Sequence, residues 1–207
     1  MTIDQIAYHL GRRDEAPNQE LAAKLVREND MAGIAEIAAH LDDKNASIAS
    51  DCIKVMYEIG YLAPGLIVSY TSKFVDLLDH KRNRMVWGAM IALSTVAVLV
   101  PNRIWPHHEK IKELIESGTV ITNVSGVRVL INLASLGDPY YSQLIDDLLR
   151  YMRECRKIDF AKRAGEMAPV IQRKHRKKFL AILEERLPEL SKAAQKRLTK
   201  TIQTIKK

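Results

Sequence analysis

Residues 34–62 read IAEIAAHLDDKNASIASDCIKVMYEIGYL, and residues 71–99 read TSKFVDLLDHKRNRMVWGAMIALSTVAVL. The two segments start 37 residues apart and share one organisation. In each, a short run of apolar residues at helical spacing is followed by a polar turn and then by a longer apolar run. In the first segment the polar turn is residues 42–45. This pattern predicts two helices per segment, each with one apolar face.

The 37-residue spacing continues along the chain in several columns of apolar or small residues. Such a period is typical of stacked supersecondary units, each of which buries its apolar face against the next. We therefore expect Ile53, Met90 and Val127 to occupy equivalent buried positions. The columns are Ile37, Phe74, Ile111 and Leu148; Leu41, Leu78, Ile115 and Met152; Ile53, Met90, Val127 and Ala164; Leu62, Leu99 and Leu136; and Gly60, Ala97 and Ala134.

Paired helices with this period resemble the HEAT-repeat family of α-solenoids, taken loosely with the armadillo-like proteins. The resemblance covers about residues 31–187 and also rests on prolines between the units. It implies an all-α fold, a right-handed α-α superhelix of stacked antiparallel helix pairs. The Arg that HEAT units often carry in the second helix is missing six residues after each turn acid. The turns are Leu41-Asp42, Leu78-Asp79 and Ile115-Glu116, and Ile48, Met85 and Thr122 stand at the Arg positions.

The ends of the chain depart from the period and read as caps. Leu183 and Leu187 lie 35 residues after Leu148 and Met152, so the last unit slips out of register. A terminal repeat needs a polar outer face, and the last helix is charged around a narrow apolar stripe. We expect one domain over residues 1–207, with a cap at 1–30, repeats at 31–173 and a basic cap at 174–207.

Composition excludes several classes of protein. With 207 residues, 47% hydrophobic content, nine Gly and 6% aromatic residues, the chain is neither disordered nor a many-turned β-sandwich. The uncharged stretch at residues 85–100 is shorter than the roughly 20 residues that span a bilayer, so we expect a buried helix and no membrane span. Residues 1–13 fit neither a signal peptide nor a transit peptide, which favours the cytoplasm.

No motif for catalysis or metal binding stands out. Phosphate-binding Gly loops, His-Glu-x-x-His and Cys-x-x-Cys are all absent from the sequence. His107 and His108 are adjacent, so on one helix they point about 100° apart and we expect a solvated turn. Neighbouring acids such as Asp42 and Asp43 do not converge as paired catalytic carboxylates must. We therefore expect no cofactor and no metal, and regard an enzyme as the less favoured class.

The two cysteines, Cys52 and Cys155, lie far apart in the chain, and we expect free thiols in a reducing compartment. Cys52 shares a column of small residues with Ala89 and Gly126, which favours a structural role. Cys155 lies among Arg153, Arg156 and Lys157, where positive charge would favour the thiolate. The second thiol is therefore the more reactive candidate, although no His partner stands near it.

Charge is concentrated at the C-terminal end. Residues 150–207 contain 18 Lys and Arg against 6 Asp and Glu, whereas residues 1–149 contain 14 against 19. Nucleic acid, an acidic protein surface or anionic lipid could use such a region, and a solubilising cap would look the same. Its densest part is a basic patch of Arg173, Lys174, Arg176, Lys177 and Lys178.

A second candidate surface follows from the resemblance, because the second helices of HEAT-like units usually line the concave side. Nearby acids such as Asp51 and Glu58 mix the signs of charge there, which suits a protein or peptide partner better than a phosphate backbone. Trp87 is the natural anchor if it is exposed. The candidate residues are Lys54, Arg84, Trp87, Arg128, Asn132 and Lys162.

Three functions remain open at this point. A noncatalytic binding scaffold leads, because no convergent catalytic set is present and a solenoid offers an extended surface. Nucleic-acid binding is second, since some HEAT-like proteins are DNA glycosylases that remove alkylated bases from a basic concave face. Trp87 with Arg84, Arg128 and Lys162 is faintly similar to that arrangement. A lyase-like or chaperone-like role, as in bilin-lyase relatives, is third and has no specific residue in its favour. Fold alone does not choose among them.

Overall fold

The computed structural model describes residues 1–206, so Lys207 of the basic cap lies outside the described residues. The chain is 80% helical, and residues 1–206 contain no strand. It divides into two compact parts, an N-terminal unit of Met1–Val129 and a C-terminal unit of Leu130–Lys207, with the boundary inside one helix. The predicted subdivision into caps at 1–30 and 174–207 around repeats at 31–173 stays a prediction.

The N-terminal unit consists of a leading helix followed by helix pairs. In each pair a short first helix ends in a 3-10 turn or a loop before a longer second helix begins. Its helices are α1 (Ala16–Glu28), α2 (Met31–Ala39), α3 (Ala46–Leu62), α4 (Thr71–Asp76), α5 (Asn83–Val96), α6 (Pro101–Ile104), α7 (His108–Ser117) and α8 (Val120–Ala134), the last crossing the boundary, with 3-10 turns at Ile3–Gln5, His40–Asp42, Pro64–Tyr70, Leu77–Asp79 and Trp105–His107.

Local signals explain where these helices begin. The carboxylate of Asp30 accepts a hydrogen bond from the Gly33 amide at 2.8 Å and caps α2. The amide oxygen of Asn45 accepts one from the Ser47 amide at 2.9 Å and caps α3. Short polar side chains at these positions satisfy N–H groups that a helix start leaves unpaired. The predicted polar turn at residues 42–45 therefore both ends one helix and starts the next.

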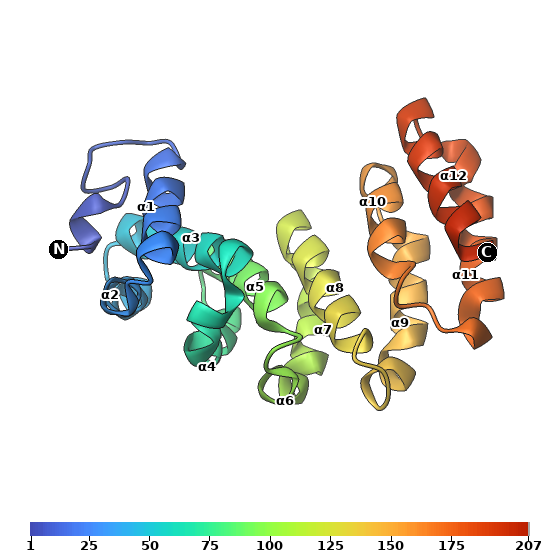
Figure 1. Ribbon diagram of the computed structural model, residues 1–207, viewed down its shortest axis with the longest axis horizontal. Coiled ribbons are helices and arrows are strands. Elements are labelled where there is room, and N and C mark those ends of the chain that lie inside the picture. The colour runs from blue at the N-terminus through green and yellow to red at the C-terminus, as the bar shows by residue number, and fades with distance from the viewer. Residues whose placement is uncertain (207) are drawn as a thin grey trace. The chain divides into compact units, whose positions relative to one another are not determined.

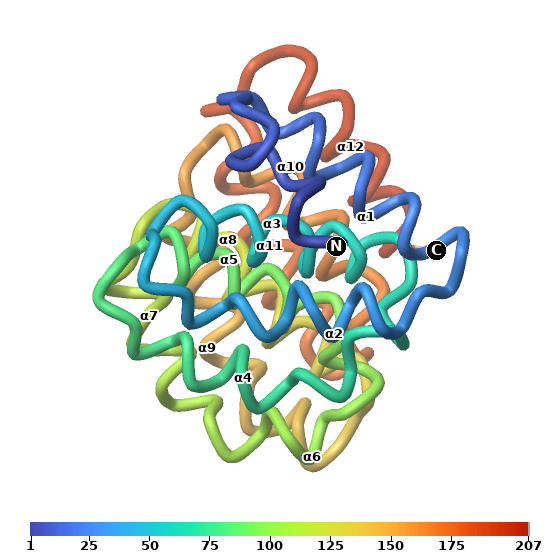
Figure 2. The backbone as a smooth tube through the Cα atoms, turned by 90° about the vertical axis from the view of Figure 1, so that its left-hand side faces the viewer, coloured from blue at the N-terminus to red at the C-terminus, as the bar shows by residue number. Residues whose placement is uncertain are grey.

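The helices of the N-terminal unit form two layers. Helix α3 packs against α1 on one side and α5 on the other, while α2 and α4 pack beneath α3 and α5. Figure 1 shows α3 and α5 as consecutive second helices, and the turned view in Figure 2 shows α2 and α4 along the opposite side. The second helices therefore form one continuous layer, which is where the candidate residues of this unit were expected.

The C-terminal unit contains two helix pairs after the end of α8. Helix α10 packs against α9 and α12, and α11 packs against α9 and α12, so this unit has first and second helices in two layers of its own. Just before α9, the carboxylate of Asp138 accepts a hydrogen bond from the Ser142 amide at 3.0 Å in the first turn of that helix. The helices are α9 (Tyr140–Glu154), α10 (Lys157–Met167), α11 (Arg176–Arg186) and α12 (Lys192–Lys206), with 3-10 turns at Arg173–His175 and Leu187–Glu189.

Burial confirms most of the repeat columns. Ile53, Met90 and Val127 are each at most 1% exposed, and so are the residues of the column that begins at Ile37. The residues of the column that begins at Leu41 are at most 2% exposed. A methyl group added to Gly126 would come within 2.6 Å of the Ile115 side chain. In the column of small residues Cys52, Ala89 and Gly126, the glycine therefore permits close approach of two helices. The column of Leu62, Leu99 and Leu136 differs, because these side chains are 42–56% exposed.

The uncharged stretch at residues 85–100 forms most of α5 and is largely buried, as predicted. No helix within residues 1–206 is both long and apolar enough to cross a membrane.

Candidate functional site

A buried cation lies at the centre of the second-helix layer in the N-terminal unit. The side chain of Lys54, on α3, is only 5% exposed, and its ammonium contacts the carboxylates of Glu15 at 2.8 Å and Glu58 at 2.7 Å. Glu58 lies one helical turn after Lys54, whereas Glu15 precedes α1 and reaches across from another element. A charge buried to this degree requires such partners, since an unpaired one would carry a large desolvation cost.

The carboxylate of Glu15 also reaches α5. Its second oxygen accepts a hydrogen bond from the Arg84 guanidinium at 3.1 Å, so one side chain bridges two helices. Lys54, and after it Arg84, hold the pKa of Glu15 below its ordinary value. Burial alone would lower the pKa of Lys54, but its hydrogen bonds to Glu15 and Glu58 outweigh burial and raise it. Both groups are therefore charged at neutral pH.

Aromatic rings lie against the same cations. The Lys54 ammonium is 4.9 Å from the centre of the Tyr57 ring, and the Arg84 guanidinium is 4.3 Å from the centre of the Trp87 ring. The ring of Tyr57 is 6.1 Å from those of both Trp87 and Tyr61, which joins α3 to α5. We call Lys54, Tyr57, Tyr61, Arg84 and Trp87 the α3–α5 strip.

The strip has a buried base and an accessible edge. Lys54 and Tyr57 are each 4% exposed, whereas Tyr61 is 51% exposed and Trp87 is half-buried. Arg128 of α8 is half-buried and interacts with Tyr61, where its charge partly offsets the rise that burial causes in the pKa of the Tyr61 hydroxyl. A flat apolar ring beside a guanidinium can bind both apolar and charged groups of a partner.

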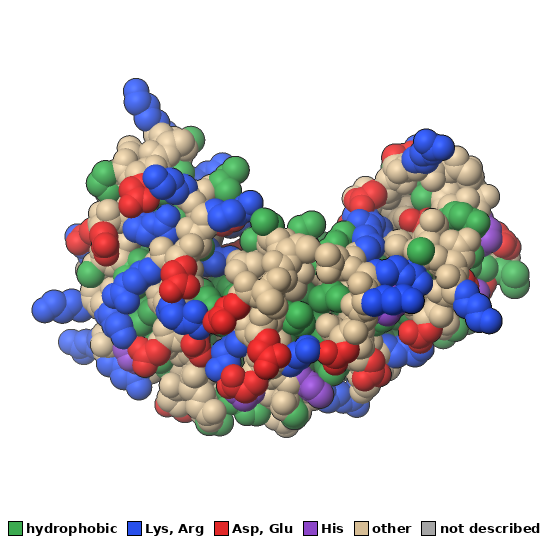
Figure 3. All heavy atoms as spheres, turned by 180° about the vertical axis from the view of Figure 1, so that it is seen from behind, with side chains coloured by type: hydrophobic (Ala, Val, Ile, Leu, Met, Phe, Trp, Pro, Cys, Tyr) green, Lys and Arg blue, Asp and Glu red, His purple; other side chains and the backbone are tan. Residues whose placement is uncertain are grey.

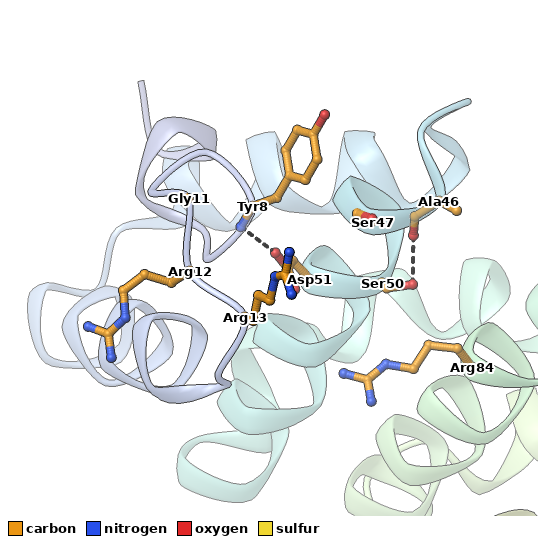
Figure 4. A pocket seen from close by; sticks show the side chains of 9 residues that line it. All are labelled: Tyr8, Gly11, Arg12, Arg13, Ala46, Ser47, Ser50, Asp51 and Arg84. Carbon is orange, nitrogen blue, oxygen red and sulfur yellow. Dashed lines mark hydrogen bonds between the residues drawn. The ribbon is translucent and has the colours of Figure 1, made fainter.

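A cavity of about 560 Å³ adjoins the strip at Arg84. It lies between the segment before α1 and the first turns of α3, and it is lined by Tyr8, Gly11, Arg12, Arg13, Ala46, Ser47, Ser50, Asp51 and Arg84. Figure 4 shows Arg84 extending from α5 toward α3, while the Arg12 side chain points away from the other labelled residues. The cavity and the strip therefore share one arginine.

The structure brings together part of the predicted set. Lys54, Arg84, Trp87 and Arg128 all belong to the N-terminal unit and lie on or beside the α3–α5 strip. Asn132 lies on α8 one turn after Arg128, but in the C-terminal unit. Lys162, on α10, also belongs to the C-terminal unit, where it lines a separate cavity of about 460 Å³ with Lys157, Ile158 and Arg197 among others.

One expectation was wrong. Lys54 was predicted to point outward, but its side chain is buried because two carboxylates and the Tyr57 ring enclose it. It therefore supports the strip from below and is not an accessible contact residue.

Sequence reasoning missed Glu15, Tyr57 and Tyr61. The sequence does contain a pattern that predicts the contact of Tyr57. Lys54 and Tyr57 are three residues apart on one helix, and Arg84 and Trp87 have the same spacing. Side chains three apart on a helix face are neighbours, so a cation followed by an aromatic at this spacing predicts a contact. Nothing comparable marks Glu15, which lies in an irregular segment without helical periodicity.

The predicted basic patch lies on the surface of the C-terminal unit. All five residues, Arg173, Lys174, Arg176, Lys177 and Lys178, are exposed at the start of the last helix pair. Lys178 forms an ion pair with Asp146 at 2.8 Å, and Lys174 lies 5.8 Å from the Tyr141 ring. Figure 3 shows that on one face of the molecule Lys and Arg side chains are interspersed with Asp and Glu.

Both cysteine thiols are free and buried in the structure. Burial raises the pKa of Cys52 to about 12. The prediction that positive charge favours the Cys155 thiolate was wrong, because burial raises its pKa despite Arg163 and Arg186 nearby. His108 hydrogen-bonds the Trp105 carbonyl at 2.8 Å, and no cluster of three metal-ligating side chains occurs in residues 1–206.

Comparisons with known proteins support the fold and go no further. No protein-family model and no curated protein matches the sequence. A designed armadillo repeat protein in complex with the peptide (KR)4 is 15% identical, with a TM-score of 0.68 over 90% of this chain and 86% of that chain. Computationally designed armadillo repeat proteins for modular peptide recognition are 14% identical, with a TM-score of 0.65 over 89% of this chain and 85% of theirs.

A further designed armadillo repeat protein is 14% identical and covers 99% of this chain and 98% of its own, with a TM-score of 0.65. At this identity the likeness shows the fold alone. The chain has an armadillo-like helical-repeat solenoid fold, and the predicted all-α right-handed superhelix of antiparallel helix pairs is confirmed.

Proposed function

We propose that the protein is a noncatalytic scaffold that binds a peptide segment of a partner protein along the α3–α5 strip. The observation that carries the proposal is the accessible edge of the strip, where Trp87 and Tyr61 lie beside Arg84 and Arg128 on successive second helices. Aromatic and arginine side chains that are already held in place are favourable anchors, because little conformational freedom is lost when they bind.

The fold supports the same assignment. One similar structure is a designed armadillo repeat protein in complex with a peptide, and others were designed for peptide recognition. Buried Lys54 and Tyr57 hold the accessible residues from below, so the surface is organised before a partner arrives.

An arrayed library of octapeptides tests the proposal. We expect the full chain to bind a subset of peptides, and Arg84→Glu with Arg128→Glu to weaken that binding by about tenfold or more. The matched control is Lys44→Glu with Lys81→Glu, which makes the same change in charge at exposed turn positions without ion pairs in the described structure. Equal binding by both double variants would refute the assignment of the strip.

Nucleic acid is the second candidate partner, through the C-terminal unit. Arg173, Arg176 and Lys177 are exposed, and none forms an ion pair with a described residue. If they contact phosphates, binding to a DNA duplex should fall by about 0.9 log unit per contact for each tenfold rise in salt. Replacing Lys174, Arg176, Lys177 and Lys178 by Ser should then flatten the salt dependence by several units. No binding by the wild type at low salt would leave these residues as a solubilising surface.

A further inference from the structure

The bridging carboxylate of Glu15 does not perform the role that its position in the chain offers. Glu15 is the N-cap residue of α1, but its side chain caps no amide of that helix. The Ala16 amide donates to Asp14 instead, at 3.0 Å. The carboxylate of Glu15 is 49% exposed, and among the described residues it pairs only with Lys54 of α3 and Arg84 of α5. The Glu15 carboxylate therefore pairs with these two cations from the solvent side. A carboxylate of a binding partner would approach them from the same side.

The two cations depend on Glu15 to different degrees. Lys54 keeps the carboxylate of Glu58 at 2.7 Å if Glu15 moves away, so the buried ammonium stays paired. Arg84 forms no other ion pair within the described residues, and it keeps the Trp87 ring at 4.3 Å. Its side chain is 31% exposed. Exchange of one carboxylate for another at Arg84 therefore leaves no buried charge unpaired. The ion pair between Glu15 and Arg84 is partly exposed, so it stabilises the position of Glu15 only weakly.

The cavity beside Arg84 offers a second cation. Arg13 lines it and forms no hydrogen bond or ion pair with a described residue. The other charges on its walls are already engaged. Arg12 is held by both oxygens of Asp14, at 2.8 and 3.0 Å. The carboxylate of Asp51 accepts hydrogen bonds from the Tyr8 amide and from the side chain of Asn18, both at 2.8 Å.

We infer that the peptide partner is acidic, and that one of its side-chain carboxylates enters this cavity, pairs with Arg13 and Arg84, and replaces Glu15 on Arg84. The inference rests on the proposed peptide-binding function and specifies its ligand. Two guanidinium groups around a cavity favour a carboxylate, because each presents several N–H donors. Asp51 and Glu58 lie nearby, and their negative charges would repel a continuous row of phosphates more than a single carboxylate. This favours a peptide over nucleic acid as the ligand.

Fluorescence polarisation with three labelled octapeptides, blocked at both ends, tests the inference on the full chain. The probes are (DE)4, (SQ)4 and (KR)4, so that only side chains differ in charge. We expect the wild type to prefer (DE)4 and Arg13→Ala or Arg84→Ala to weaken it by about fivefold or more. Glu15→Gln keeps the shape of the side chain but removes the competing charge, and should strengthen (DE)4 binding by about two- to fivefold.

Glu20→Gln is the matched control for Glu15→Gln. It removes one negative charge from the same helix at an exposed position without an ion pair in the described structure, and it should leave the affinity for (DE)4 unchanged. An equal gain in (DE)4 affinity in both variants would mean that the affinity depends on the net charge of the unit and not on Glu15 itself. That result would overturn the inference.

The remaining outcomes separate the inference from the proposed function. If (SQ)4 or (KR)4 binds more tightly than (DE)4 and binding still depends on Arg84 and Trp87, the strip binds peptides but the acidic partner is wrong. If neither these probes nor any member of the octapeptide library binds, both are wrong. If Glu15→Gln strengthens binding of a DNA duplex as much as that of (DE)4, the cavity takes phosphate and the inference is overturned.

Discussion

Each unit contains a largely buried cation, Lys54 in the N-terminal unit and Arg186 in the C-terminal unit, and the two have different kinds of partner. In the N-terminal unit the side chain of Lys54 is 5% exposed and pairs with two carboxylates, those of Glu15 and Glu58. In the C-terminal unit the side chain of Arg186 is 13% exposed, lies 3.6 Å from the carboxylate of Glu189, and also donates hydrogen bonds to main-chain carbonyls at the end of α9. Its hydrogen bonds to the carbonyls of Arg153 and Cys155 are 2.7 and 2.8 Å long.

The two units also differ in surface charge, although both are built from helix pairs. A cation at the C-terminal end of a helix is stabilised in part by carbonyls that the helix leaves unpaired. The C-terminal unit has 18 Lys and Arg against 9 Asp and Glu, and much of its positive charge stays on the surface. The N-terminal unit has 14 against 16, and in it Lys54 and Arg84 share the carboxylate of Glu15.

The core contrast between the units gives the largest expected effect. The column of Ile53, Met90 and Val127 continues in the C-terminal unit as Ala164, so one position holds large side chains in one unit and a methyl group in the other. Met90→Ala should lower the free energy of unfolding by about 2–5 kcal/mol, because it leaves a cavity in a fully buried site. Urea denaturation followed by tryptophan fluorescence measures this in the N-terminal unit, since both tryptophans, Trp87 and Trp105, lie there.

Ala164→Met is the reciprocal change in the C-terminal unit. Overfilling a packed site should cost about 1–3 kcal/mol, and amide hydrogen exchange in α10 would report it. A negligible cost for Met90→Ala would show that this column does not carry the core, and a gain in protection for Ala164→Met would show that the C-terminal unit has an unfilled site.

The buried cation gives the next effect. Lys54→Ala leaves Glu58 without its cation and Glu15 with Arg84 alone. It should cost about 2–3 kcal/mol in the free energy of unfolding, less than for a fully buried pair because both acids reach solvent. Lys162→Ala removes an exposed lysine from a second helix of the C-terminal unit and should change that free energy by less than about 0.5 kcal/mol. Equal costs in urea denaturation followed by circular dichroism would remove the distinction between the units.

The repeat fold was predictable because the burial of apolar columns imposes a period that the sequence shows directly. The same reasoning does not separate core columns from surface columns at helix ends. Leu62, Leu99 and Leu136 keep the period, but they lie at or beyond the last turn of their helices, where the neighbouring layer no longer covers them. The 37-residue period therefore predicts which residues occupy equivalent positions in successive repeats. How exposed those residues are depends on how far the neighbouring layer of helices extends.

The candidate site was predictable only in part, for a related reason. Arg84, Trp87 and Arg128 lie off the apolar face of their helices, and that much follows from helical spacing. The burial of Lys54 does not follow, because it depends on Glu15 from an irregular segment 39 residues earlier. A long-range ion pair formed by a single side chain leaves no pattern in one sequence.

The smallest expected effect is the acid dependence of the Glu15 bridge. Lys54 and Arg84 lower the pKa of Glu15 in the folded protein, so its contribution to stability is fully present above the unfolded value of about 4.3. That contribution is lost as the pH falls through the lower folded value, when the carboxylate takes up a proton. Because the carboxylate is half exposed, its contribution at neutral pH should be about 0.5 kcal/mol.

Urea midpoints of the wild type and Glu15→Gln, measured by tryptophan fluorescence from neutral pH down to about pH 3, therefore test the bridge within the N-terminal unit. The two midpoints should differ at neutral pH and converge below about pH 4, since a protonated Glu15 is as neutral as Gln. The Glu20→Gln variant should follow the wild type throughout, because no cation holds that carboxylate. A gap between wild type and Glu15→Gln that stays constant with pH would mean that Glu15 stabilises the unit by its shape, and that its charge does not hold α1 to α3 and α5.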